Sequence, residues 1–185
     1  GPNALLITEG ALNGQRLDAV AKVRGLDSVA AAIAVIREHD PGVASFNQTE
    51  RDIAAFMRRP WVMTGSDASA GHPRVYGSFA RKFRLYVRER HVIDLRAFVA
   101  RSSAQTADML GLTDRGRLRV GGFADVVVFD PRRFAERATY EKPTELAVGV
   151  RTVVVNGTIA VDQGAMTGAA AGRALAKTPP AGSCR

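Results

Sequence analysis

The character of the chain changes near residue 113, and this change limits the folds that the sequence can adopt. Before it, stretches with apolar residues at helical spacing alternate with short apolar runs. After it, glycine-rich turns separate runs of β-branched residues, as in TDRGRLRVGGFADVVVFDP (113–131). In VRTVVVNGTIAVDQG (150–164), the pair Asn156-Gly157 between two apolar runs is a strong signal for a β-hairpin. The sequence therefore predicts an α/β protein whose second part is antiparallel.

The first part is expected to contain several helices joined by short strands. Helical spacing predicts helices at 15–25, 27–42, 49–59, 78–90, 94–102 and 102–112. Asp27 or Ser28 can serve as the N-cap of the second helix, and Thr49 as that of the third. Strands are expected at 4–8 and 43–48, and the apolar run WVMT (61–64) predicts a short buried strand.

A polar stretch rich in glycine and serine, TGSDASAGHPRVYGSF (64–79), follows this apolar run. It contains Asp67, His72 and Arg74. In α/β proteins, loops at the carboxyl ends of the strands present the reactive side chains. A plain connection from strand to helix, with Asp67 capping the next helix, explains the spacing equally well. The residues alone leave both interpretations open.

The net charge of +8 and the pI near 10.5 raise nucleic acid as a candidate partner. Much of the excess lies in the helical pattern 78–90, where the apolar residues occupy a face of their own. This arrangement is more typical of a solvated helix face than of a phosphate-binding surface, and no zinc-finger, RRM or KH motif accompanies it. A basic nucleic-acid-binding module is therefore only a weak alternative.

The apolar runs and the cysteine content bear on membrane spans and disulfides, but they do not identify the cellular compartment. No apolar run approaches the roughly 20 residues that a membrane span requires. The chain has one cysteine, Cys184, so no disulfide can form within it. The compartment stays open between the cytoplasm and the periplasm of a bacterium.

Several motifs together resemble one enzyme family. WVMTGSD followed by HPRVYGSF, then GRLRVGGFADVVVFDP and VVVNGTIAVDQGAMTGAAAGRAL, are similar to the C-terminal part of the D-aminoacylase (N-acyl-D-amino-acid deacylase) family. This family belongs to the amidohydrolase superfamily. The resemblance runs in order from Leu5 to about Leu175, and the His-Pro-Arg-x-Tyr-Gly motif is its narrowest part.

The resemblance implies a fold in three parts. Members of the family have a metal-bearing (β/α)8 barrel and a small β-sandwich. Residues 1–112 would form the C-terminal segment of the barrel, with its last strand near 61–66. Residues 113–168 would be the returning sandwich strands, and 169–185 a C-terminal tail.

The resemblance also implies an amide hydrolysis with Zn²⁺, one or two ions, as cofactor. Asp67 matches a carboxylate that serves the family as metal ligand and general base. Arg74 matches an arginine that holds the α-carboxylate of an N-acyl-D-amino acid, and a guanidinium fork suits that task. His72 and Tyr76 would orient the loop or line the substrate pocket. Ala68 stands where the family has glycine, and the loop before the His-Pro-Arg motif is shorter. These differences leave open which acyl group and which amino-acid side chain the substrate carries.

The remaining metal ligands are not found in this sequence. Zinc takes about four ligands, often histidines and cysteines. The chain has three histidines, none in a His-x-His pair, and its cysteine lies near the end. We therefore expect the C-terminal portion of an enzyme, completed by an N-terminal half present as a second chain or as a missing segment. A non-catalytic, amidohydrolase-like remnant or partner chain is the alternative.

Overall fold

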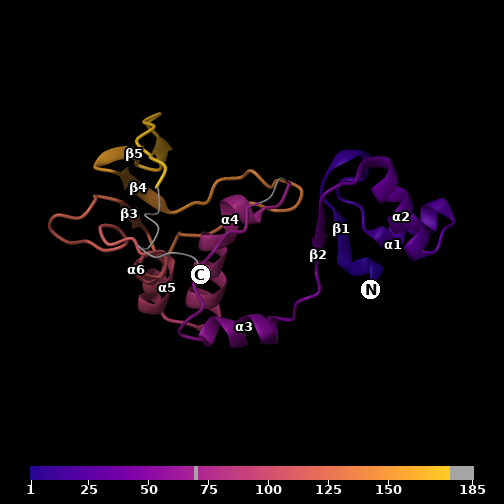
Figure 1. The fold of residues 1–185 in the computed structure, drawn as a ribbon, viewed down its shortest axis with the longest axis horizontal. Coiled ribbons are helices and arrows are strands. Elements are labelled where there is room, and N and C mark those ends of the chain that lie inside the picture. Colours follow the sequence, from indigo (N-terminus) through magenta and orange to yellow (C-terminus); the bar gives the residue numbers. More distant parts are fainter. Residues whose placement is uncertain (69–70, 176–185) are drawn as a thin grey trace, which may run out of the picture.

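A computed structural model describes residues 1–68 and 71–175 of the chain (Figure 1). A small N-terminal lobe, residues 1–46, projects from a larger body, and an extended connection joins the two. Ser69, Cys184 and the predicted tail beyond residue 175 lie outside the described residues. No helix in the described ranges is long and apolar enough to cross a membrane.

The N-terminal lobe packs two helices against a two-stranded antiparallel sheet. Its elements are η1 (Pro2–Ala4), β1 (Leu5–Ile7), η2 (Gly10–Leu12), α1 (Leu17–Arg24), α2 (Ser28–His39) and β2 (Val43–Ser45). Asp27 caps α2, because its carboxylate accepts hydrogen bonds from the N–H groups of Val29 and Ala30 at 2.8 and 2.9 Å. The core of the lobe consists of two apolar clusters, one of Ile7, Val20 and Val35 and one of Leu17, Ala21 and Ala31.

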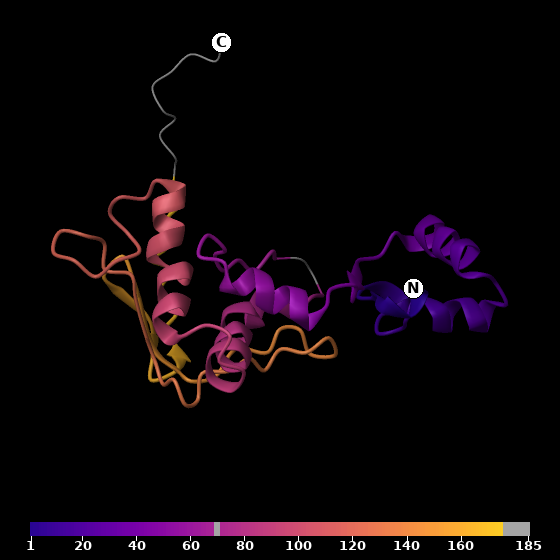
Figure 2. The ribbon, with the colours of Figure 1, turned by 90° about the horizontal axis from the view of Figure 1, so that it is seen from below.

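Five helical elements form one side of the larger body. They are α3 (Glu50–Arg58), α4 (Arg74–Arg81), the π-helix η3 (Lys82–Glu89), α5 (Leu95–Ser102) and α6 (Ala104–Leu110). Thr49 caps α3 as predicted, and its hydroxyl accepts a hydrogen bond from the N–H of Asp52 at 3.2 Å. The helix predicted at 78–90 is divided between the end of α4 and η3. Figure 2 shows α5 and α6 following each other nearly in line beside the sheet.

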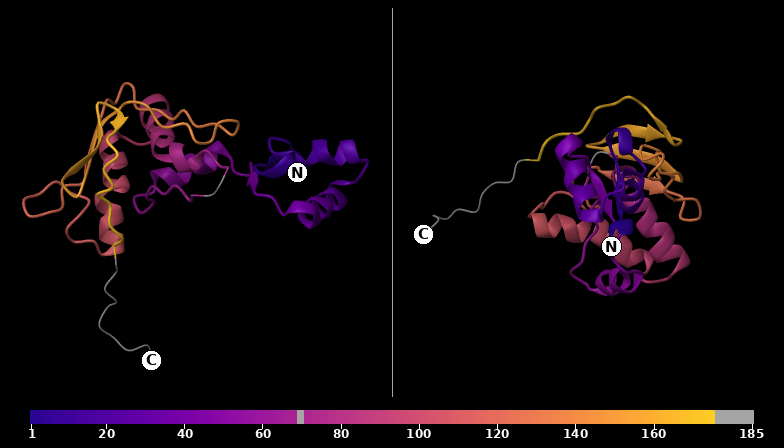
Figure 3. Two further views of the ribbon diagram at one scale, coloured as in Figure 1. Left: turned by 90° about the horizontal axis from the view of Figure 1, so that it is seen from above. Right: turned by 90° about the vertical axis from the view of Figure 1, so that its right-hand side faces the viewer.

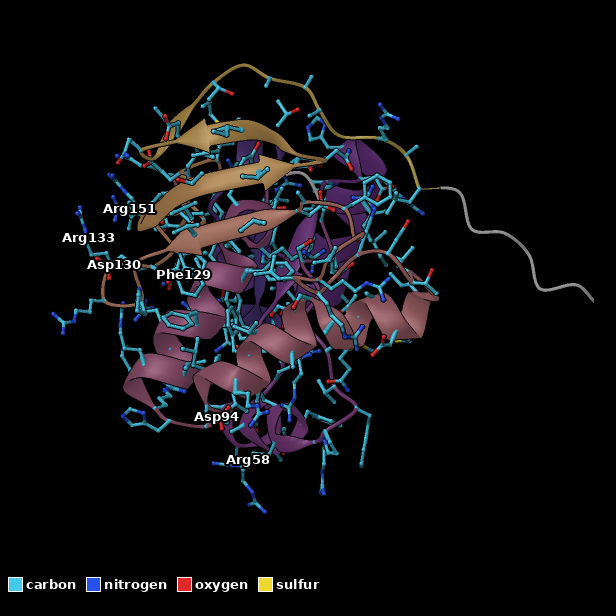
Figure 4. The ribbon with its side chains drawn as sticks, turned by 90° about the vertical axis from the view of Figure 1, so that its left-hand side faces the viewer. Arg58, Asp94, Phe129, Asp130, Arg133 and Arg151 are labelled. Carbon is cyan, nitrogen blue, oxygen red and sulfur yellow. The ribbon has the colours of Figure 1, made fainter. Side chains whose placement is uncertain are left out.

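The predicted antiparallel second part is present. Four strands lie in the order β3 (Val126–Phe129), β4 (Val150–Val155), β5 (Thr158–Asp162) and β6 (Ala165–Met166). Asn156 and Gly157 form the two-residue turn between β4 and β5 with φ angles of 49° and 82°, so the predicted hairpin is confirmed. The sheet lies over the helices in Figure 4, and Phe129 at the end of β3 packs against Phe83 and Phe134 with ring centroids 5.4 and 4.9 Å away.

Arginines of the α4–η3 region hold the chain that follows β3. Arg84 Nε donates a hydrogen bond to Glu136 Oε2 at 2.8 Å, and only 10% of the Glu136 side chain is exposed. Arg88 donates to the backbone carbonyls of Pro131 and Arg132. These arginines are therefore structural anchors rather than members of a purely solvated face. Part of the positive charge that made nucleic acid a candidate partner is therefore engaged in contacts within the protein.

Two expected strands do not form. Residues 61–66, expected as the last barrel strand, have no strand ladder, and Trp61 is 68% exposed instead of buried. A ladder needs a neighbouring extended backbone, and in the described residues the segment meets helix α5 instead, where the N–H of Thr64 donates to the carbonyl of Arg101 at 3.2 Å. Residues 118–120, for which the turn–strand–turn pattern of 113–122 also predicts a short strand, are likewise irregular. No parallel strand pair occurs in 1–68 and 71–175, so the barrel assignment and the boundaries at 112 and 168 stay predictions.

Candidate functional site

The polar loop after residue 64 brings Asp67 and Arg74 together. Asp67 Oδ2 lies 2.9 Å from Arg74 Nη1, and the Asp67 side chain is 86% exposed. Asp67 has a φ of 48°, a left-handed conformation that aspartate tolerates better than most residues. The N-cap of α4 is Pro73, with no side-chain hydrogen bond, so the interpretation of Asp67 as a helix cap is wrong. The carboxylate instead faces solvent beside the guanidinium.

His72 stabilises this loop through both ring nitrogens. Its Nδ1 accepts a hydrogen bond from the N–H of Arg74 at 3.0 Å, and its Nε2 lies 3.2 Å from the hydroxyl of Tyr140. An accepting Nδ1 places the proton of the neutral ring on Nε2, which can donate to Tyr140. Burial, and next the nearby Arg74, lower the pKa of His72, although Asp67 acts in the opposite direction. Both ring nitrogens are thus engaged within the protein, an arrangement that fits the predicted role of His72 in orienting the loop.

Tyr76 lies on the rim of a shallow cavity of about 390 Å³ beside His72. Residues from the polar loop, from α4 and from the returning chain line it: Ala68, Gly71, His72, Val75, Tyr76, Pro143 and Thr144. Gly71 has a φ of 66°, and a Cβ there would lie 2.6 Å from the carbonyl oxygen of Thr8. Glycine at this position therefore lets the loop rest against the N-terminal lobe.

Tyr140 contacts the loop of the candidate site, and the sequence did not predict this contact. It belongs to the long connection between β3 and β4, which reaches toward the N-terminal lobe (Figures 1 and 3). Its ring contacts both His72 and Phe46 edge to face, with centroids 5.1 and 5.2 Å away. In the sequence, Tyr140 stands in a stretch without periodicity, so nothing local marks it as a partner of His72.

A second feature that the sequence did not reveal lies at the base of the loop. Lys82 Nζ donates a hydrogen bond to Thr64 Oγ1 at 2.8 Å, and the Thr64 and Ser102 hydroxyl oxygens are 2.9 Å apart. A cavity of about 700 Å³ opens beside them, and its walls include Met57, Thr64 and Lys82. The segment that carries Asp67 is thus attached to two helices by polar side chains.

One side chain of the loop suits a metal ion, but the described residues do not supply a full set of ligands. Asp67 offers an exposed carboxylate, a donor that zinc accepts, and so it fits as one ligand. Residues 1–68 and 71–175 contain no group of three or more His, Cys, Asp or Glu side chains that could hold a metal ion. His39 ends α2 and His91 follows η3, both far in sequence from the loop.

Comparison with known proteins identifies the family. The sequence profile of the amidohydrolase family matches residues 3–161. The D-aminoacylase of Alcaligenes xylosoxydans xylosoxydans is 39% identical over 172 residues, which are 90% of this chain and 35% of that protein. The N-acyl-D-glutamate deacylase of the same organism is 40% identical over 148 residues, or 78% of this chain and 30% of that protein.

Solved structures agree with this match. A D-aminoacylase described with a binuclear metal centre superposes with a TM-score of 0.86 at 34% identity, covering 94% of this chain and 38% of that one. The N-acyl-D-glutamate deacylase of Bordetella bronchiseptica, crystallised with zinc and a phosphonate mimic of the tetrahedral intermediate, gives a TM-score of 0.78 at 36% identity. That match covers 85% of this chain and 34% of the other. The chain thus spans about a third of the length of these relatives. Profile, sequence and fold agree that the chain belongs to the amidohydrolase family, with D-aminoacylase and N-acyl-D-amino-acid deacylases among its relatives.

Proposed function

We propose that this chain is part of a zinc-dependent enzyme that hydrolyses the amide bond of N-acyl-D-amino acids. The observation that carries the proposal is the pairing of Asp67 with Arg74 on one exposed loop, at 2.9 Å. The carboxylate of Asp67 can accept and donate a proton, and the guanidinium of Arg74 can bind a carboxylate of the substrate. The relatives named D-aminoacylase, N-acyl-D-glutamate deacylase and N-acyl-D-aspartate deacylase support this substrate class.

Asp67 is the general base in this proposal. A bound zinc ion would supply Lewis-acid chemistry and lower the pKa of a coordinated water toward about 7. The Asp67 carboxylate, as one ligand, would accept the proton of the attacking water and deliver it to the leaving amine. Its exposure leaves room for both partners on the solvent side of the loop.

Arg74 is the residue that positions the substrate. It already binds a carboxylate, that of Asp67, through one guanidinium nitrogen. When a substrate binds, its α-carboxylate would replace that of Asp67 at the guanidinium. The positive charge of Arg74 would therefore be paired with a carboxylate in both states. Burial of its neighbour His72 in neutral form keeps a competing positive charge away from this carboxylate. Arg74 starts α4, and His72 accepts a hydrogen bond from its backbone N–H, so the backbone that carries the guanidinium is held in place.

The other zinc ligands would come from an N-terminal half of the same enzyme. The surface of the chain supports this part of the proposal. A compact monomer of this mass would expose about 8600 Å², whereas the chain exposes 12715 Å². Large apolar side chains on several elements are open to solvent, among them Val23, Phe56, Trp61, Met109 and Leu118. Exposed apolar area of this extent is typical of a surface that another part of the protein covers.

The test is hydrolysis by the full-length protein that contains this chain. N-acetyl-D-glutamate, N-acetyl-D-aspartate and N-acetyl-D-leucine would be compared with their L enantiomers, and the release of free amino acid would be measured. The proposal expects turnover of at least one D substrate, its loss on chelation, and its return with zinc. A folded full-length protein that binds zinc and hydrolyses none of them would instead support the non-catalytic alternative.

A further inference from the structure

Lys82, the first residue of η3, is the only charged side chain that the described part of the chain buries. The residue is 9% exposed and forms no ion pair with the described acidic residues. Burial lowers the pKa of Lys82 to about 8, and the nearby Arg101 adds to this effect. A buried charge without an acidic partner costs folding free energy. Methionine would fill the same space without that cost, so packing alone does not account for the ammonium group.

The contacts of Lys82 lead to the loop of the candidate site. Its Nζ donates to Thr64 Oγ1 at 2.8 Å, Ser102 Oγ lies 2.9 Å from the same oxygen, and the N–H of Thr64 donates to the carbonyl of Arg101 at 3.2 Å. Three hydrogen bonds from two helices therefore meet at one residue. Since residues 62–68 have no strand ladder, Thr64 is the residue through which hydrogen bonds attach this segment to η3 and α5.

We infer that Lys82 is a positioning residue, which holds Thr64 and thereby fixes the base of the loop that carries Asp67. Thr64 is followed by Gly65, where a Cβ would meet nothing within 4 Å, so the backbone between the anchor and Asp67 has little support of its own. The cavity of about 700 Å³ beside Lys82 leaves space into which an unanchored segment can shift. A displacement of about 1 Å at a reacting group can cost a factor of about 100 in rate. The inference rests on the proposed function, because it concerns where the Asp67 carboxylate lies relative to the substrate amide.

The experiment is a double-mutant cycle in the full-length protein, with N-acetyl-D-amino acids as substrates. Lys82→Met and Thr64→Val each remove one partner of the hydrogen bond, and Thr64→Ser keeps the hydroxyl. Each disruptive variant is expected to lower kcat roughly 10- to 100-fold with KM within about twofold, because the loop, not substrate affinity, is affected. The double variant should be no slower than the slower single variant, and Thr64→Ser should retain the wild-type kcat.

Arg81→Met supplies the matched control. Arg81 precedes Lys82 and lines the same cavity, but its ion pair is with Glu136, at 3.4 Å. The kcat of the Arg81→Met variant should equal that of the wild type. Additive losses in the cycle, or an equal loss in Arg81→Met, would overturn the inference while leaving the proposed function intact. No turnover by the wild-type protein would overturn the proposed function, and this inference with it.

Discussion

Replacing Lys82 with methionine is expected to make the protein more stable at neutral pH. An ordinary lysine has a pKa of 10.5, whereas that of Lys82 is about 8 in the folded chain. Each tenfold change in proton affinity is worth about 1.4 kcal/mol, so keeping Lys82 charged at pH 7 costs the folded state about 3 kcal/mol. Loss of the hydrogen bond to Thr64 returns about 1 kcal/mol of this, since Thr64 still contacts Ser102. The net gain at pH 7 is therefore about 2 kcal/mol.

The pH dependence gives the sign of this effect independently. Between pH 8 and 10.5, the unfolded chain binds a proton at Lys82 that the folded chain has released, so the wild-type free energy of unfolding rises with pH in this window. Lys82→Met lacks that rise. Its advantage is full below pH 8, is lost at about pH 9.5, and turns into a disadvantage of about 1 kcal/mol, that of the missing hydrogen bond, by about pH 10.5. Urea unfolding of both full-length proteins from pH 6 to 10.5 measures the difference.

Lys22→Met is the control, because Lys22 is an exposed lysine on α1 and the same substitution there should leave the pH profile unchanged. A Lys82→Met protein that is less stable than the wild type at pH 7, together with a wild-type profile that is flat from pH 8 to 10.5, would refute the reasoning from burial. If the variant is instead more stable and slower, Lys82 is an instance of stability given up for function.

Three further predictions concern the site and the surface. Asp67→Asn should lower kcat by roughly 1000-fold or more, because the amide neither accepts the proton nor binds metal as well; near-normal turnover in a steady-state assay would remove Asp67 from the mechanism. Arg74→Lys keeps the charge and loses the fork, so kcat/KM should fall for substrates with an α-carboxylate and stay unchanged for an amide without one; equal losses would make Arg74 structural. The isolated 185-residue chain should bind no stoichiometric zinc and show no cooperative thermal unfolding, whereas the full-length protein should bind zinc and unfold cooperatively. Tightly bound zinc in the isolated chain, measured by elemental analysis, would identify a self-sufficient domain.

Local signals in the sequence predicted much of the fold. Asp27 and Thr49 cap helices as expected, because capping depends on neighbours three residues away. Asn156-Gly157 turns the hairpin for a similar reason, since both residues adopt positive φ angles. These features need no knowledge of the rest of the molecule.

Long-range contacts account for what the sequence did not predict. The apolar run at 61–64 predicted a buried strand, but strand formation depends on a neighbouring backbone that the described residues do not provide. Lys82 lies in the helical pattern 78–90, for which the sequence predicts a solvated basic face, and its burial follows from packing against Thr64 and α5. Tyr140 meets His72 across 68 residues of sequence, which no periodicity encodes.

The contact between Tyr140 and His72 has a consequence for synthesis on the ribosome. The loop at 71–74 emerges well before residue 140, so during translation it lacks the phenol that steadies its histidine. Domains fold as their residues emerge from the N-terminal side. The loop therefore reaches its final arrangement only when the connection between β3 and β4 has been made and has docked beside Phe46. A nascent or prematurely terminated chain carries Asp67 and Arg74 but lacks the Tyr140 hydroxyl that contacts His72, so the arrangement of this loop depends on residues that are synthesised much later.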